Sequence, residues 1–110
     1  MKSLPVSGVA RFYDEEGKGP PVLPVHGSMS SARQWRSLSE ALRARHRMLM
    51  PDVLTASADE DAAPGVFTFA EDVALVAALI DHAEAPVHLI GHSYGGVVAI
   101  KAAFARQPQL

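Results

Sequence analysis

A turn with almost no room for side chains most strongly constrains how this chain can fold. In "VHLIGHSYGGVVAIKAA" (residues 87–103), a short apolar run leads directly into a helix-like segment. Ser93 stands at the junction, with Gly91 two residues before it and Gly95 two residues after it. A strand that turns this sharply into a helix needs glycine wherever a side chain would collide with neighbouring backbone. The spacing therefore predicts a strained turn that pushes the Ser93 hydroxyl outward.

The pattern Gly-x-Ser-x-Gly between a strand and a helix is that of a nucleophile elbow. Tyr94 follows Ser93 in the first helical turn, where backbone N–H groups lack partners and the helix dipole favours negative charge. We expect the Tyr94 N–H to be one donor of an oxyanion hole. The alternative is a serine that only closes a glycine-rich turn, since the bare motif arises by chance in roughly a few of every hundred chains of this size.

The rest of the chain alternates strands with helices. Ser7-Gly8 is a turn dipeptide between two strand-like runs, and Thr68 with Glu71 forms a capping box. The expected elements are a β-hairpin over 3–17, strands at 22–25, 48–52 and 87–91, and helices from Ser30 or Ser31 past Leu42, from Thr68 to about Glu84, and from Tyr94 to Pro108, with a loop over 55–66. This order predicts an α/β fold with a mainly parallel sheet and helices on both faces.

Composition narrows the function classes. The 110 residues are 48% hydrophobic and 20% charged, which suits a single globular unit. A net charge of −2 gives no electrostatic reason to expect a nucleic acid or a membrane as partner. No apolar stretch is long enough to span a bilayer, and the N-terminus is a poor signal peptide. The absence of cysteine excludes disulfides and zinc–thiolate sites. A cytoplasmic location is our expectation, although the sequence itself leaves the compartment open.

A second candidate segment is His26-Gly27-Ser28-Met29, between a predicted strand and a predicted helix. In elbow architectures the loop at this place supplies the second oxyanion donor. We expect that donor to be the Ser28 N–H, with Met29 next in line. His26 is interpreted as a hydrogen-bonding support for the loop rather than as a catalytic base. Candidates for a pocket wall are Met29, His92 and Tyr94.

Three segments together, "VLPVHGSMSSARQW", "MLMPD" and "VHLIGHSYGGVVAIKAA", resemble the N-terminal half of the α/β-hydrolase fold superfamily, especially its small esterase-like and carbon–carbon-bond hydrolases. The resemblance implies that Ser93 is the nucleophile and that Ser28 and Tyr94 supply the oxyanion hole. It implies that His92, just before the nucleophile, is not the base, and that no metal or organic cofactor is needed. Serine rather than aspartate at position 93 argues against the related haloalkane dehalogenases and epoxide hydrolases.

The largest departure from that family lies after Ser93. The family order is nucleophile, then acid, then histidine, but residues 94–110 contain no Asp, Glu or His. All five histidines precede the serine, and His88, inside an apolar run, is interpreted as a core residue. We therefore expect residues 1–110 to be a partial domain from a serine hydrolase that acts on an ester or similar acyl compound.

Two alternatives stay open. The first is that the chain is a truncated, non-catalytic interaction module that keeps the elbow. The second is that it is one half of an enzyme whose other half is supplied by a second chain. In the isolated polypeptide the strand before Ser93 is expected to be an exposed apolar edge, and exposed edges favour self-association.

Overall fold

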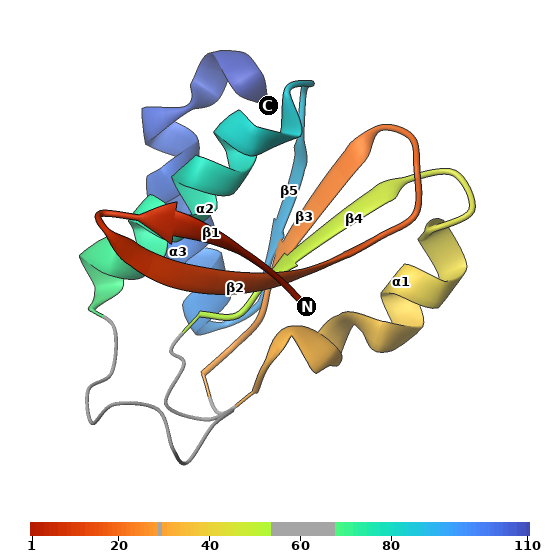
Figure 1. The fold of residues 1–110 in the computed structure, drawn as a ribbon, viewed down its shortest axis with the longest axis horizontal. Coiled ribbons are helices and arrows are strands. Elements are labelled where there is room, and N and C mark those ends of the chain that lie inside the picture. Colours follow the sequence, from red (N-terminus) through yellow and green to blue (C-terminus); the bar gives the residue numbers. More distant parts are fainter. Residues whose placement is uncertain (29, 54–67) are drawn as a thin grey trace.

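A five-stranded sheet lies between two layers of helices in the computed structural model, which describes residues 1–28, 30–53 and 68–110 (Figure 1). The strand order is β1-β2-β4-β3-β5. The strands are β1 (Lys2–Val6), β2 (Val9–Glu16), β3 (Pro21–Val25), β4 (Arg47–Pro51) and β5 (His88–Gly91). The predicted hairpin and the three predicted apolar strands are all present. Met29 and the predicted loop over 55–66 lie outside the described residues.

The N-terminal hairpin is closed by Ser7 and Gly8, which both have positive φ, 51° and 80°. Two such residues form the tight turn that matches the right-handed twist of paired strands. β2 then pairs antiparallel with β4, while β4, β3 and β5 run parallel to one another. The sheet is thus parallel where Ser93 and the loop after β3 are located, and antiparallel only at the hairpin.

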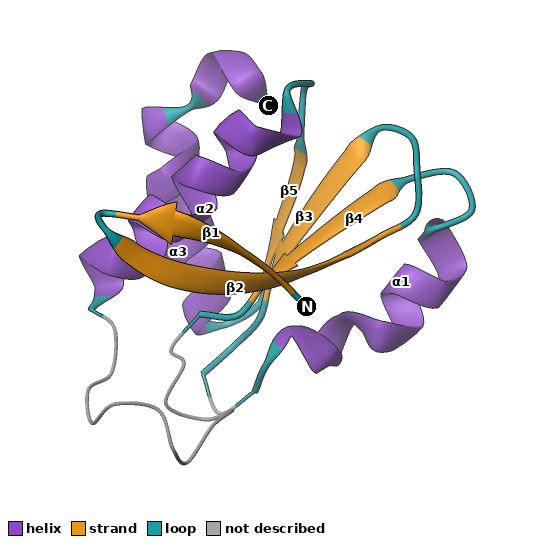
Figure 2. Ribbon diagram, viewed as in Figure 1, coloured by secondary structure: helices purple, strands orange, loops and turns teal. Residues whose placement is uncertain are grey.

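Helices cover both faces of the sheet, as Figure 2 shows. A 3₁₀ turn, η1 (Ala32–Trp35), and helix α1 (Arg36–Leu42) connect β3 to β4 and pack on one face. Helices α2 (Phe69–Ala83) and α3 (Tyr94–Ala105) pack on the other. All five residues of β3 are buried, because this strand has a neighbour on each side and helices above and below.

The larger core cluster lies between the sheet and the α2–α3 layer. Leu75, Leu79 and Ile80 recur at helical spacing along α2 and are fully buried against the sheet. The predicted capping box is formed, since Glu71 N–H donates to Thr68 Oγ1 at 3.1 Å and Thr68 N–H donates to Glu71 Oε1 at 2.9 Å. On the other face, Trp35 packs partly buried against a smaller cluster that contains Met48 and Met50.

Two predicted helices have different ends in the structure. The first begins as a 3₁₀ turn, because the Ser31 hydroxyl accepts the Arg33 N–H and tightens the entry. The last ends at Ala105 rather than at Pro108. Pro108 has no N–H to give and would clash with the preceding turn, so the chain leaves the helix at Arg106 and forms a short 3₁₀ turn, η3 (Gln107–Gln109).

Strand β5 and helix α3 carry exposed apolar side chains. In the described part of the chain β5 pairs with β3 alone, so its outer edge has no partner strand. Ile90 is 36% exposed on β5, and Val97, Ile100 and Phe104 on α3 are 57%, 62% and 72% exposed. His88 is exposed too, so its interpretation as a core residue is wrong for residues 1–110, because no strand of the described residues covers the outer edge of β5. Within the described ranges, none of the helices has the length and apolarity needed to cross a bilayer.

We expect a polypeptide of residues 1–110 to self-associate through this apolar surface. The double substitution Ile100→Lys with Phe104→Lys should shift it toward monomer, because charged side chains oppose burial of the α3 face. Sedimentation velocity over a concentration series measures the effect. Val9→Lys, at a similarly exposed apolar position on the hairpin, is the control. A monodisperse, cooperatively melting monomer of the unsubstituted polypeptide would contradict the expectation.

Candidate functional site

Ser93 occupies a strained backbone conformation between β5 and α3. Its φ is 53° and its ψ is −122°, a region that residues other than glycine rarely adopt. Its side chain is exposed. The turn therefore places a hydroxyl on the surface at the N-terminus of a twelve-residue helix.

The neighbouring glycines are required because backbone approaches them closely. A Cβ on Gly95 would lie 2.1 Å from the carbonyl oxygen of Val25 and 2.4 Å from that of His26. A Cβ on Gly91 would lie 2.5 Å from the Cα of Gly96. The first turn of α3 thus rests directly on the end of β3, and only glycine fits at both positions.

The loop after β3 is adjacent to this turn. A Cβ on Gly27 would lie 2.9 Å from His92 Nδ1 and 3.4 Å from Ser93 Cβ, so the loop and the elbow are in contact. Ser28 follows Gly27 and is exposed. Tyr94 is the first residue of α3, so its N–H precedes the intrahelical hydrogen bonds of that helix. The structure therefore brings together the segments that contain Ser93, Tyr94 and Ser28.

The His26 side chain stabilises this loop through two hydrogen bonds to the backbone. It is fully buried, and its Nε2 accepts the Val53 N–H at 3.0 Å. The proton must then be on Nδ1, which lies 2.7 Å from the Gly27 carbonyl oxygen and donates to it. Because both ring nitrogens have backbone partners, His26 is not placed to take a proton from Ser93. Asp52 stabilises the other end of the loop, because its carboxylate accepts a hydrogen bond from the Ala32 N–H at 2.9 Å.

The Tyr94 side chain contacts α2. Its hydroxyl donates to Asp72 Oδ2 at 2.7 Å, and its ring packs edge-on against Phe69. Asp72 in turn pairs with Arg11 of β2, and both of these charged side chains are buried. Burial, and then the Asp72 carboxylate, raise the pKa of Tyr94, so the phenol remains a hydrogen-bond donor. Within the described residues, the Tyr94 side chain is thus engaged with α2.

Sequence reasoning did not identify three residues that hold the site together. Gln34 contacts both the loop and His92, while Arg11 and Asp72 fix the Tyr94 side chain. Arg11 did carry a signal, because it alternates with Tyr13 on the inward face of β2, where an arginine needs a buried partner. Gln34 carried none, since a polar residue in a first helical turn is ordinarily a surface residue.

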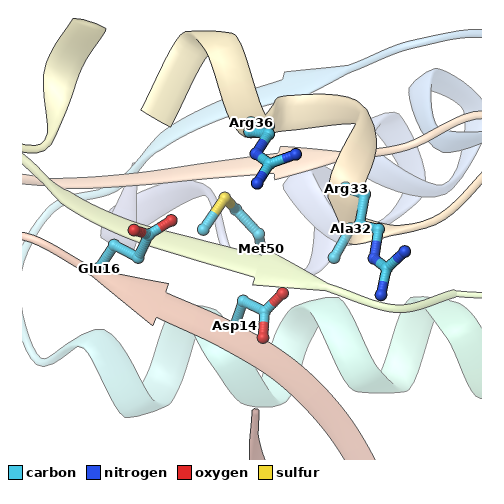
Figure 3. A pocket seen from close by; sticks show the side chains of 6 residues that line it. All are labelled: Asp14, Glu16, Ala32, Arg33, Arg36 and Met50. Carbon is cyan, nitrogen blue, oxygen red and sulfur yellow. The ribbon is translucent and has the colours of Figure 1, made fainter. Parts of the chain in front are cut away.

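A separate hollow of about 360 Å³ lies on the α1 side of the sheet (Figure 3). Its lining residues are Asp14, Glu16, Ala32, Arg33, Arg36 and Met50, and none of them belongs to the elbow or to the loop after β3. In the residues that the structure describes, no group of three His, Cys, Asp or Glu side chains is placed to hold a metal ion.

Comparison with known proteins agrees with this geometry. The profile of the alpha/beta hydrolase family matches residues 22–108. Lipase LipV of Mycobacterium tuberculosis is 37% identical over 90 residues, which are 81% of this chain and 33% of that protein. The putative carbamate hydrolase RutD of Azorhizobium caulinodans is 35% identical over 98 residues, 86% of this chain and 36% of that protein. The chain thus spans about a third of the length of these relatives.

A solved structure gives the same result for the fold. The epoxide hydrolase VrEH1 of Vigna radiata superposes with a TM-score of 0.84 at 27% identity. The match covers 99% of this chain and 35% of that protein.

The two glycines that follow Tyr94 should respond oppositely to alanine. Gly95→Ala should lower the free energy of unfolding by about 3 kcal/mol or more, because its methyl group would overlap two carbonyl oxygens. Gly96→Ala should be neutral or stabilising by up to about 1 kcal/mol, because a Cβ there meets nothing closer than 3.7 Å and alanine favours a helix. Urea denaturation of the two variants in the natural protein measures the difference. Equal changes in the free energy of unfolding for the two variants would contradict the close contact between Gly95 and the end of β3.

The buried Arg11–Asp72 pair should be costly to break from one side. Asp72→Ala should lower the free energy of unfolding by about 3–5 kcal/mol, because it leaves a buried guanidinium without its carboxylate. Asp81→Ala is the matched control, since Asp81 pairs with Arg106 at the surface and should cost about 1 kcal/mol or less. The double variant Arg11→Met with Asp72→Leu should lower the free energy of unfolding by less than the sum of the losses in the single variants Arg11→Met and Asp72→Leu. Additive losses in thermal or urea unfolding would contradict coupling within the pair.

Proposed function

Because the chain belongs to the alpha/beta hydrolase family, we propose that it is the nucleophile-bearing part of a serine hydrolase that cleaves an ester or related acyl bond. The observation that carries the proposal is the strained Ser93 turn in contact with the loop after β3. An exposed hydroxyl, an adjacent helix N-terminus and a second backbone segment at the same place are what acyl transfer requires in addition to a base.

In the proposed reaction the Ser93 Oγ attacks the acyl carbonyl carbon and its proton passes to a base. The carbonyl oxygen becomes an oxyanion that accepts hydrogen bonds from the N–H groups of Tyr94 and Ser28. When the tetrahedral intermediate collapses, the carbon–oxygen or carbon–sulfur bond breaks and the leaving group takes the proton. Water then attacks the acyl-enzyme carbonyl by the same route, which releases the carboxylic acid and restores the Ser93 hydroxyl.

The base and its supporting acid are proposed to come from polypeptide beyond residues 1–110, as the family order of residues implies. The histidines near Ser93 support this assignment. His26 uses both ring nitrogens on the backbone, and the Nδ1 of His92 contacts Gln34. A small acyl compound is the proposed substrate, and no metal or organic cofactor is needed for these steps.

A second candidate is an interaction module that retains the elbow without catalysis. The exposed apolar side chains of β5 and α3 favour it, because a surface of this kind binds polypeptide. The reactivity of Ser93 separates the two candidates, since a serine hydroxyl without a base is a weak nucleophile.

We expect the natural protein that carries this sequence to react covalently with a fluorophosphonate probe at Ser93. Ser93→Ala should abolish the labelling, and Ser37→Ala, an exposed serine on α1, should leave it unchanged. Mass spectrometry of the labelled peptide, with the intact mass of the natural protein, provides the measurement. Labelling that persists in the Ser93→Ala variant, or a folded natural protein that does not label, would reject the hydrolase proposal in favour of the interaction module.

A further inference from the structure

One side chain joins the two segments of the proposed oxyanion hole. Gln34 lies in η1, and its Oε1 accepts the Gly27 N–H at 3.1 Å. Its Nε2 lies 3.0 Å from Nδ1 of His92, the residue directly before Ser93. Gln34 therefore bridges the loop after β3 and the elbow after β5, although these segments are far apart in the sequence.

The backbone that carries Gln34 is fixed. The Gln34 N–H donates to the Ser31 carbonyl at 3.0 Å, and the first residue of η1, Ala32, is held by Asp52. Asp52 follows β4 and packs beside His26. The amide group of Gln34 thus extends from an anchored turn rather than from a free loop.

The two contacts determine which groups donate and which accept. Since Oε1 accepts from Gly27, the Nε2 group is the donor toward His92. The His92 Nδ1 must then be unprotonated, and the ring proton is on its Nε2. The Gly27 N–H is already engaged, which is consistent with the expectation that the oxyanion donor is an amide farther along the loop, that of Ser28 first.

We propose that Gln34 is a positioning residue that holds the loop and the elbow at a fixed separation, so that the Ser28 and Tyr94 N–H groups converge on one oxygen atom. The inference rests on the proposed hydrolase function for its catalytic consequence, but the bridge itself is a property of the fold. Glutamine suits the task because one amide group supplies both an acceptor for Gly27 and a donor for His92. Leucine, of similar size, supplies neither, and glutamate supplies only the acceptor.

The bridge is tested without any activity measurement by nitrogen-15 NMR of the natural protein. In the unsubstituted protein above the titration range of histidine, the ring of His92 should be protonated on Nε2, with His92→Asn used to assign its signals. In Gln34→Glu the carboxylate can only accept, so the ring proton should move to Nδ1. In Gln34→Leu the Gly27 amide should exchange with solvent faster. His92 and Gly27 signals that are the same in all three proteins would overturn the bridge.

The positioning role is tested by the rate constant of fluorophosphonate labelling. Gln34→Leu should slow labelling by about tenfold to 100-fold, the size of effect expected when reacting groups are misplaced by about 1 Å. Gln34→Glu, which keeps the acceptor for Gly27, should recover part of that loss. Gln107→Ala, at an exposed glutamine in η3 just beyond the end of α3, is the control and should label at the unsubstituted rate.

The outcomes separate this inference from the function that it refines. A natural protein that does not label refutes the hydrolase proposal, and the NMR signals then decide whether the bridge exists. A natural protein that labels, with Gln34→Leu labelling at the same rate, leaves the hydrolase proposal standing and overturns the positioning role. A slower Gln34→Leu with partial recovery in Gln34→Glu supports both.

Discussion

The structure depends on one close backbone contact, between the first turn of α3 and the end of β3. The carbonyl of Val25 accepts the His92 N–H at 3.1 Å, and Gly95 lies so close to the same carbonyl that no side chain fits between them. Because β3 is the buried strand of the parallel sheet, this contact sets the height and direction of the helix. It also fixes where the chain leaves β3, so the following loop is beside Ser93. The strain in the Ser93 backbone is tolerated because packing on both sides determines the turn.

Polar contacts around this turn come from distant parts of the chain. Arg11 of the hairpin and Asp72 of α2 form a buried pair that also binds the Tyr94 hydroxyl. A buried ion pair adds little net stability, because desolvation offsets the attraction between the charges, but it disfavours arrangements in which either partner is alone. In this fold the pair specifies how the hairpin, α2 and α3 are placed relative to one another. His26, Asp52 and Gln34 do the same for the loop after β3.

The fold was predictable from the sequence because its signals are local. The glycine spacing around Ser93 reports a steric requirement within five residues, and the capping box at Thr68 reports one helix start. The contacts of Gln34 and Arg11 were not predictable, because each joins residues that only the tertiary fold brings together. His88 was misjudged for a related reason. An apolar run indicates a strand, but which of its side chains are buried depends on the elements that pack against it in the tertiary fold.

Outside α3 itself, the contacts described above for the segment that contains Ser93 come from parts of the chain that precede it: Arg11, the end of β3, the loop that follows it, Gln34 and Asp72. A ribosome synthesises a protein from its N-terminus, so these partners of the turn are already made when α3 leaves the exit tunnel. The geometry of the nucleophile can therefore be established early in translation, without waiting for sequence made later. Segments made later can then differ without altering the turn that presents the hydroxyl.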